Sequence, residues 1–315
     1  MIKQYLLAPG PTPIPDEVVR AMAQTMIHHR TPQFSKIFAE AREGLKALFG
    51  TKNDVVVLAS SGTGAMEAAI SNLFSPGEKV LVINGGKFGE RWLQIALAYG
   101  LEAIQLKVEW GKAVKVEVVE KHLKVYPDIK GVLIQASETS TTTLHPVREI
   151  AQIARNGPLL IVDGVTAVGV LPVPMDEWGI DVLVTGSQKA LMLPPGLGFV
   201  ALSDRAWDRT EKAKLPRFYL DLKLERKNQH KGSTAFTPAV SLIFGLHASL
   251  KMMQDEGLER VYARHERLAR ATRAAATALG LKLLAPENPS PAATGIMLPE
   301  GTDGDKLLDY LRERM

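Results

Sequence analysis

The feature that most constrains the fold is a regular alternation of short apolar segments and amphipathic segments between about residue 16 and residue 205. Several apolar segments are continuous runs, as expected for strands that helices cover on both faces. This order predicts an α/β fold with a mostly parallel sheet between helices. The predicted strands are residues 55–58, 79–83, 102–107, 131–135, 159–163, 182–185 and 199–202. The predicted helices are residues 16–24, 33–49, 64–73, 88–99, 117–124 and 147–155.

The alternation stops in the second half of the chain. Residues 205–240 are polar and predict an irregular crossing, whereas a helical pattern follows from about residue 238 to residue 279, broken near Gly257. A strand-like segment at 295–298 and a helix at 303–314 close the chain. We therefore predict two domains. Residues 1–249 form a large domain with an N-terminal arm (1–15), and residues 250–315 form a smaller α+β domain.

One lysine stands at an unusual place. The apolar run that begins at Val182 leads into Gly186-Ser187-Gln188-Lys189, and a Pro-Pro-Gly turn follows at 194–196. A lysine amine among apolar neighbours loses its proton more readily and becomes a nucleophile toward carbonyls. Pyridoxal 5'-phosphate (PLP) is a cofactor built around such an amine, because its aldehyde forms a Schiff base with it. A surface lysine at a strand end is the alternative interpretation.

Asp163 closes the apolar run 159–163. A carboxylate at the end of a buried strand is costly unless it is paired. A protonated pyridine nitrogen is a suitable partner, because the carboxylate keeps the ring protonated. The alternatives are an aspartate that caps the next turn, or a metal ligand. No cluster of histidines or carboxylates lies near it in the sequence, so the pattern does not favour a metal.

The segment Ser61-Gly62-Thr63-Gly64 follows the first predicted strand and opens a helix. Free N–H groups and the helix dipole favour an anion there, and the hydroxyls add hydrogen bonds. An ordinary helix cap is the alternative. The segment matches neither of two nucleotide-binding motifs. The Rossmann motif lacks its third glycine and its downstream acidic residue, and the Gly-Lys-Ser/Thr sequence of a P-loop is missing.

Two hydroxyl-rich segments are further candidates for contacts with the cofactor. Residues 137–143 follow a predicted strand and can donate to the phenolate oxygen of a pyridoxal ring, although a Ser/Thr-rich loop is the default interpretation. Thr234 and Thr237 precede Pro238 and can either bind phosphate or cap a helix. Four of these sites lie at the carboxyl ends of strands, where open α/β sheets bind ligands. Each signal is weak alone, but the combination is specific for PLP.

Composition excludes several other functions. The 315 residues include no cysteine, which rules out disulfides, thiolate metal sites and cysteine nucleophiles and fits a cytoplasmic protein. The net charge of +4 is spread along the chain and does not favour nucleic acid. No apolar stretch is long enough to span a bilayer, and the N-terminal segment does not match a signal peptide. We expect no nucleic-acid, membrane or metal partner.

The residues together resemble the class V aminotransferases, a branch of the fold-type I PLP enzymes. The resemblance covers nearly the whole chain and is greatest to the alanine/serine–glyoxylate (or serine–pyruvate) aminotransferase group. It is carried by motifs at residues 7–13, 28–34, 60–67, 84–85, 88–91, 138–140, 163–165 and 186–189.

The resemblance implies a role for each position. Lys189 would hold the aldehyde and shuttle the α-proton, and Asp163 would pair with the ring nitrogen. The other implied cofactor contacts are Val165 and Phe88 on the two ring faces, Thr139 at the ring oxygen, Ser61, Gly62, Thr63 and Gln188 at the phosphate, and Thr237 with Thr234 from the second subunit of a homodimer.

The resemblance also implies a reaction, in which PLP mediates transfer of an amino group from serine or alanine to glyoxylate or pyruvate. Family members continue past the point where this chain stops, and that portion carries the arginine that grips the substrate carboxylate. Arg312 and Arg314 do not match that motif. The alternatives are a catalytically impaired or structural dimer, or a different donor such as aspartate or phosphoserine. A cysteine desulfurase is excluded, because it needs a cysteine.

Overall fold

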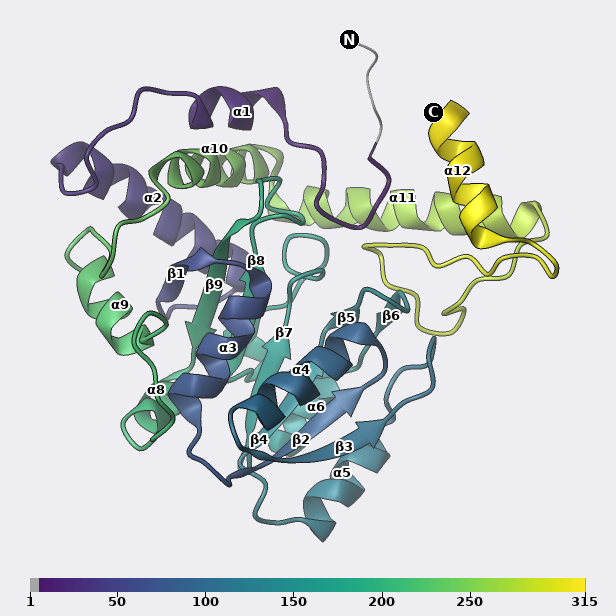
Figure 1. The fold of residues 1–315 in the computed structure, drawn as a ribbon, viewed down its shortest axis with the longest axis horizontal. Coiled ribbons are helices and arrows are strands. Elements are labelled where there is room, and N and C mark those ends of the chain that lie inside the picture. The colour runs from purple at the N-terminus through teal and green to yellow at the C-terminus, as the bar shows by residue number, and fades with distance from the viewer. Residues whose placement is uncertain (1–5, 315) are drawn as a thin grey trace.

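In the computed structural model, which describes residues 6–314, the predicted alternation forms one seven-stranded sheet with helices on both faces (Figure 1). The strand order is β1-β9-β8-β7-β4-β2-β3. Only β9 runs antiparallel to its neighbours, so the prediction of a mostly parallel sheet is confirmed. The strands are β1 (Val55–Ser60), β2 (Lys79–Asn84), β3 (Glu102–Lys107), β4 (Gly131–Gln135), β7 (Leu159–Asp163), β8 (Val182–Gly186) and β9 (Gly196–Leu202). Strands β5 (Ser137–Glu138) and β6 (Thr143–Leu144) form a separate small sheet.

The helices cover the sheet as two layers, with the later helices extending beyond it (Figure 1). They are α1 (Asp16–Met22), α2 (Pro32–Phe49), α3 (Gly62–Leu73), α4 (Lys87–Ala98), α5 (Val116–Val125), α6 (Val147–Ala154), α7 (Met175–Trp178), α8 (Asp204–Thr210), α9 (Leu222–Gln229), α10 (Val240–Glu256), α11 (Leu258–Ala278) and α12 (Gly304–Arg314). No helix within residues 6–314 is long and apolar enough to cross a membrane.

Two hydrophobic cores lie on the two faces of the sheet. In β1, Val55 and Val57 belong to one core, and Val56 and Leu58 belong to the other. The first core is closed by helices that include α2, α6 and α10, and the second by α3, α4 and α8. Because successive strand residues point to opposite faces, a strand with two buried faces must be apolar throughout. This explains the continuous runs in the sequence.

The parallel strands end at one edge of the sheet. Strand β7 ends at Asp163, β8 ends at Gly186, and β4 ends at Gln135, beside Asp163 in the register of the two strands. Loops at the carboxyl ends of an open α/β sheet are the usual place for a ligand. The predicted site residues of the sheet region therefore gather at this edge.

Two predictions in the second half of the chain were wrong. Residues 205–240 are not simply irregular, because Ser203 and Asp221 cap helices α8 and α9 through hydrogen bonds from Ala206 N (3.2 Å) and Leu224 N (2.9 Å). Residues 295–298 form no strand, only one isolated bridge between Ile296 and Leu283. The helical break at Gly257 is confirmed, with φ 87° between α10 and α11.

The division into two domains near residue 250 stays a prediction. The first five residues of the predicted N-terminal arm lie outside the described residues.

Candidate active site

Lys189 lies just after β8, in a loop that Ser187 holds closed. The Ser187 hydroxyl donates to Pro194 O (2.7 Å) and accepts from Leu197 N (3.2 Å), which ties the two ends of the loop together. Lys189 is buried, with 8% of its surface exposed. Burial lowers the pKa of the Lys189 amine, and the charge of Asp163 partly opposes this effect. The sequence therefore delivers the amine to a place where its neutral, nucleophilic form is easier to reach than in water.

The N-terminal arm covers this lysine. The Nζ atom of Lys189 donates to Pro9 O (3.2 Å), and Thr12 holds the arm in place through Thr12 N to Gln188 O (3.1 Å) and Thr12 Oγ1 to Lys189 O (3.0 Å). A Cβ atom on Gly10 would lie 2.4 Å from Lys189 Cδ. The glycine thus lets the arm pass directly over the lysine side chain.

Asp163 lies at the end of β7, next to β8, and 4% of its surface is exposed. Within residues 6–314 its carboxylate accepts a single hydrogen bond, from Val165 N (2.8 Å). Burial raises the pKa of Asp163 to about 7, and the charge of Glu138 adds to this, against the opposing Val165 bond and the charges of Arg91 and Lys189. Such a carboxylate gains strongly from a cationic partner.

The N-terminus of α3 lies beside these two groups. Ser61 is its N-cap, and the Ser61 hydroxyl accepts from Gly64 N at 3.4 Å. The other N–H groups in the first turn of a helix have no partner within the helix, and the dipole there favours an anion. The predicted phosphate contacts Ser61, Gly62 and Thr63 are therefore placed together at a helix N-terminus.

Two glycines, Gly62 and Gly186, keep the space at the start of α3 free of side chains. A Cβ atom on Gly62 would lie 2.7 Å from Val165 Cγ2, and one on Gly186 would lie 2.8 Å from Gln188 Oε1 and 3.0 Å from Gly62 N. These contacts bring Gly62, Val165 and Gln188 into one group. The Gln188 Oε1 atom is buried and has no hydrogen-bond partner among the described residues. A buried amide in this state is suited to a polar ligand.

Phe88 lies in the first turn of α4 and is connected to the same helix start. The guanidinium of Arg91 lies over the Phe88 ring, 4.8 Å from its centroid, and donates to Thr63 Oγ1 at 3.1 Å. Arg91 therefore links the predicted stacking residue to the predicted phosphate contact. Thr139 is buried on the turn between β5 and β6, where its hydroxyl lies 2.5 Å from that of Thr166.

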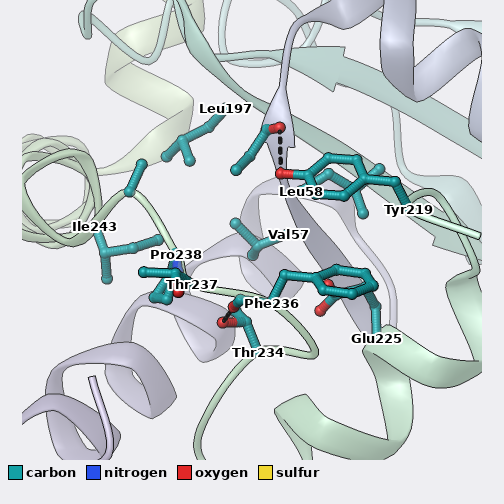
Figure 2. A pocket seen from close by; sticks show the side chains of 12 residues that line it. Val57, Leu58, Leu197, Tyr219, Glu225, Thr234, Phe236, Thr237, Pro238 and Ile243 are labelled. Carbon is teal, nitrogen blue, oxygen red and sulfur yellow. Dashed lines mark hydrogen bonds between the residues drawn. The ribbon is translucent and has the colours of Figure 1, made fainter. Parts of the chain in front are cut away.

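Thr234 and Thr237 lie elsewhere in this chain. They line a small pocket between β1, β9 and α10 that does not include Lys189, Asp163 or Ser61 (Figure 2). The Thr234 hydroxyl donates to Phe236 O (2.5 Å), and Thr237 is exposed. The structure of one chain does not bring these two threonines to the lysine.

Sequence reasoning assigned no role to Arg91, Thr166 or the backbone of Pro9, all of which contact predicted site residues. Arg91 could have been found, because it stands three positions after Phe88 on a helix and so shares its face. Thr166 and Pro9 gave no such signal, because their contacts lie 27 and 180 positions away in the chain.

A mostly parallel seven-stranded sheet of this order, with a buried lysine and a buried aspartate at adjacent strand ends, is the α/β fold of a fold-type I PLP-dependent enzyme. The family model of the class V aminotransferases ("Aminotransferase class-V") matches residues 4–314. The chain belongs to this family of PLP-dependent aminotransferases.

The chain is also similar to individual proteins along most of its length. The chain is 44% identical to the soluble hydrogenase 42 kDa subunit of Anabaena cylindrica, over 99% of this chain and 82% of that protein. It is 38% identical to the serine–glyoxylate aminotransferase of Methylorubrum extorquens, over 98% of this chain and 80% of that protein. The crystal structure of an aspartate aminotransferase from Thermus thermophilus matches with a TM-score of 0.92 and 37% identity, over 99% of this chain and 87% of that one.

Proposed function

We propose that this aminotransferase uses PLP to move the amino group of serine or alanine to glyoxylate or pyruvate. One observation carries the proposal. The buried amine of Lys189 and the buried carboxylate of Asp163 lie at the ends of neighbouring strands, beside the glycine-lined N-terminus of α3. An aldehyde, a ring nitrogen and a phosphate are the three groups by which PLP is held, and the arrangement offers one partner for each.

The residues fit the cofactor chemically. Asp163 is poorly compensated, and a pyridinium nitrogen would supply the cation that its carboxylate lacks. Gln188 lies beside Gly186 and the start of α3 at Gly62, and its side-chain NH₂ group would donate to the phosphate there. Ser61, Gly62 and Thr63 would hold the same phosphate. Val165 and Phe88 would lie against the two ring faces, and Thr139 would reach the ring oxygen.

When bound, PLP supplies the electron sink that stabilises the substrate carbanion. The protein residues would bind and orient the cofactor and the substrate, and would move the proton. Lys189 would hold the aldehyde, and its Nζ atom, when free, would accept the α-proton of the amino acid and return it, a role that the lowered pKa of the amine favours. Burial of the site excludes water from this exchange.

We further propose a homodimer in which Thr237 and Thr234 complete the phosphate site of the partner subunit. The support is their position away from Lys189 in their own chain, together with an unusual surface. Phe236 packs against Phe218 and Tyr219, with ring centroids 5.5 and 5.2 Å apart, and Phe218 is 77% exposed. Figure 2 shows Phe236 between Tyr219 and the two threonines. Exposed aromatic clusters of this kind are typical of interfaces.

The choice of donor rests on the similarity to the glyoxylate aminotransferase group, including the serine–glyoxylate relative. Aspartate is the second candidate, because the structural relative from Thermus thermophilus is an aspartate aminotransferase.

The test is a set of half-reactions followed by absorption. Purified protein is loaded with PLP, and serine, alanine and aspartate are added in turn, after which glyoxylate or pyruvate is added. We expect the absorption band of the lysine-bound cofactor to disappear with serine or alanine and to return with glyoxylate. Conversion by aspartate alone would replace the proposed donor. A protein that takes up PLP but converts with none of the three would indicate the structural dimer, and one that takes up no PLP would contradict the proposal.

A further inference from the structure

A buried carboxylate beside the site has no part in the function described above. Glu138 lies in β5, on the segment after β4, and its surface is 0% exposed. Its Oε2 atom accepts from Gly89 N (3.0 Å) and Phe88 N (3.2 Å), and its Oε1 atom accepts from the Ser140 hydroxyl (2.6 Å). Ser140 in turn accepts from Lys87 N (2.9 Å). The carboxylate is therefore fully bonded, mostly to the start of α4.

Helix α4 depends on this carboxylate for its N-terminal cap. The N-cap position is Gly86, which has no side chain to accept from the free N–H groups of the first turn. Glu138 supplies those acceptors from a different segment, and its negative charge complements the helix dipole. A Cβ atom on Gly86 would lie 2.6 Å from Glu138 Cδ and 2.4 Å from Ser140 Oγ. The glycine at this position therefore leaves the space that the carboxylate occupies.

This arrangement connects two proposed cofactor contacts. Glu138 fixes the backbone of Phe88 directly, and Thr139 is the next residue along its own segment. The Phe88 ring is held on the other side by Arg91, whose second contact is Thr63. The charge of Glu138 also reaches Asp163, where it adds to the effect of burial in raising the pKa of that carboxyl.

We propose that Glu138 is a positioning residue, which fixes the ring of Phe88 and the hydroxyl of Thr139 in the orientation that PLP requires. This inference rests on the proposed function of the site. The geometry favours it over a purely stabilising role, because both ends of the contact belong to segments that carry a proposed cofactor contact.

The experiment compares three variants with the wild type. Glu138→Gln keeps the shape of the side chain but turns an NH₂ group toward backbone N–H donors. Gly86→Ala keeps the charge but displaces the carboxylate. Asp221→Asn is the matched control, because it makes the same carboxylate-to-amide change at the N-cap of α9, where Asp221 accepts from Leu224 N (2.9 Å). The measurements are PLP affinity by equilibrium dialysis and the visible circular dichroism per bound PLP.

We expect Glu138→Gln to weaken PLP binding by about tenfold and to reduce the dichroism per bound cofactor by roughly half, because the ring is held less firmly. Gly86→Ala should change both in the same direction. Hydrogen exchange at the Phe88 and Gly89 amides of the apoprotein should become faster in both variants. Asp221→Asn should lower the melting temperature slightly and leave both cofactor measurements unchanged.

Unchanged affinity and dichroism in a Glu138→Gln protein whose melting temperature falls would overturn the assignment and leave a purely structural role. If that variant does not fold, Gly86→Ala decides by the same two measurements. If the wild type binds PLP and the variants show the same affinity and dichroism, this inference alone is contradicted. A wild type that takes up no PLP overturns the proposed function, and this inference with it.

Discussion

Two buried aspartates at opposite edges of the sheet are in opposite electrostatic states. Asp54 precedes β1 at the amino edge, where its carboxylate accepts from Arg42 (2.8 Å), Arg226 (2.9 Å) and His230 (2.6 Å). Asp163 ends β7 at the carboxyl edge and accepts one backbone hydrogen bond among the described residues. Burial alone would raise the pKa of Asp54, but the hydrogen bonds from Arg226 and His230, together with the charges of His230 and Arg42, lower it. The pKa of Asp163 is raised to about 7.

The difference distinguishes a carboxylate that the protein itself neutralises from the one that we propose binds the cofactor. The partners of Asp54 come from α2, α9 and the residue after α9, so the charge ties three segments together. Burial of the Asp163 carboxylate costs free energy, and the single hydrogen bond that it accepts among the described residues does not offset this cost. Strained or uncompensated charges of this kind cluster at binding and catalytic sites, where a ligand supplies the missing partner. Asp163 at the carboxyl edge of the sheet therefore favours a cationic ligand, whereas Asp54 at the amino edge already has its cationic partners within the protein.

The largest effect is expected from Lys189→Ala. Without the amine, covalent attachment of PLP and the proton transfer are both lost, so turnover should fall by at least ~10³-fold. The absorption band of the lysine-bound cofactor should be absent from the variant. Steady-state kinetics with the proposed donor and spectra of the loaded protein measure both. Turnover within tenfold of the wild type would remove Lys189 from the proposed mechanism.

Asp163→Asn should have two effects of opposite sign. Turnover of the loaded enzyme should fall by ~10²-fold or more, because the ring nitrogen loses its charged partner. The apoprotein should become more stable at pH 8. The folded pKa of about 7 lies above the ordinary aspartate value of 3.8, so the wild type loses stability as the pH rises between these values.

Asp163→Asn removes the cost of ionising a buried carboxyl, so it should stabilise the apoprotein by on the order of 2–4 kcal/mol above pH 7, and by little near pH 4. Urea unfolding at pH 4.5 and pH 8 measures the difference. Equal stability of variant and wild type at pH 8 would mean that Asp163 is already compensated within the protein, and the contrast with Asp54 would disappear.

Asp54→Asn should behave in the opposite way. It should cost about 2 kcal/mol of unfolding free energy at pH 7, because three cationic side chains lose their shared carboxylate. Since the folded pKa of Asp54 is lowered, its contribution is complete above the ordinary pKa and is lost as the pH falls through the folded value. The cost should therefore shrink in acid. PLP affinity measured on the same protein should stay within about twofold of the wild type, because the site lies at the other edge of the sheet.

The smallest effect is expected from Ser61→Ala. Loss of the N-cap should cost about 1 kcal/mol of stability and, through the missing hydroxyl, weaken PLP binding by about threefold to tenfold. Ser203→Ala is the matched control, since Ser203 caps α8 through Ala206 N (3.2 Å). It should cost similar stability and leave PLP affinity unchanged. Equal PLP affinities for the two variants would show that Ser61 serves α3 alone.

Much of the fold followed from local sequence patterns. The boundaries of β4 and β7 agree with the prediction, because two buried faces require continuous apolar runs with defined ends. The boundaries of β3 agree as well, although this strand lies at the side of the sheet and is only partly buried. Helices α8 and α9 were missed, because their polar composition conceals short buried faces such as Ala206 and Trp207. The capping residues Ser203 and Asp221 were the signal available to find them.

By itself the sequence determined which residues end the strands, and therefore which chemical groups reach the carboxyl edge of the sheet. Periodicity and chain direction are local properties, and they are sufficient for that. Only the tertiary structure decided the charge state of each group. The partners of Asp54 lie up to 176 positions away in the chain, and the charged groups that act on Asp163 come from β5, α4 and the loop after β8. Electrostatic energies depend on these distances in space and on burial, which only the folded chain defines.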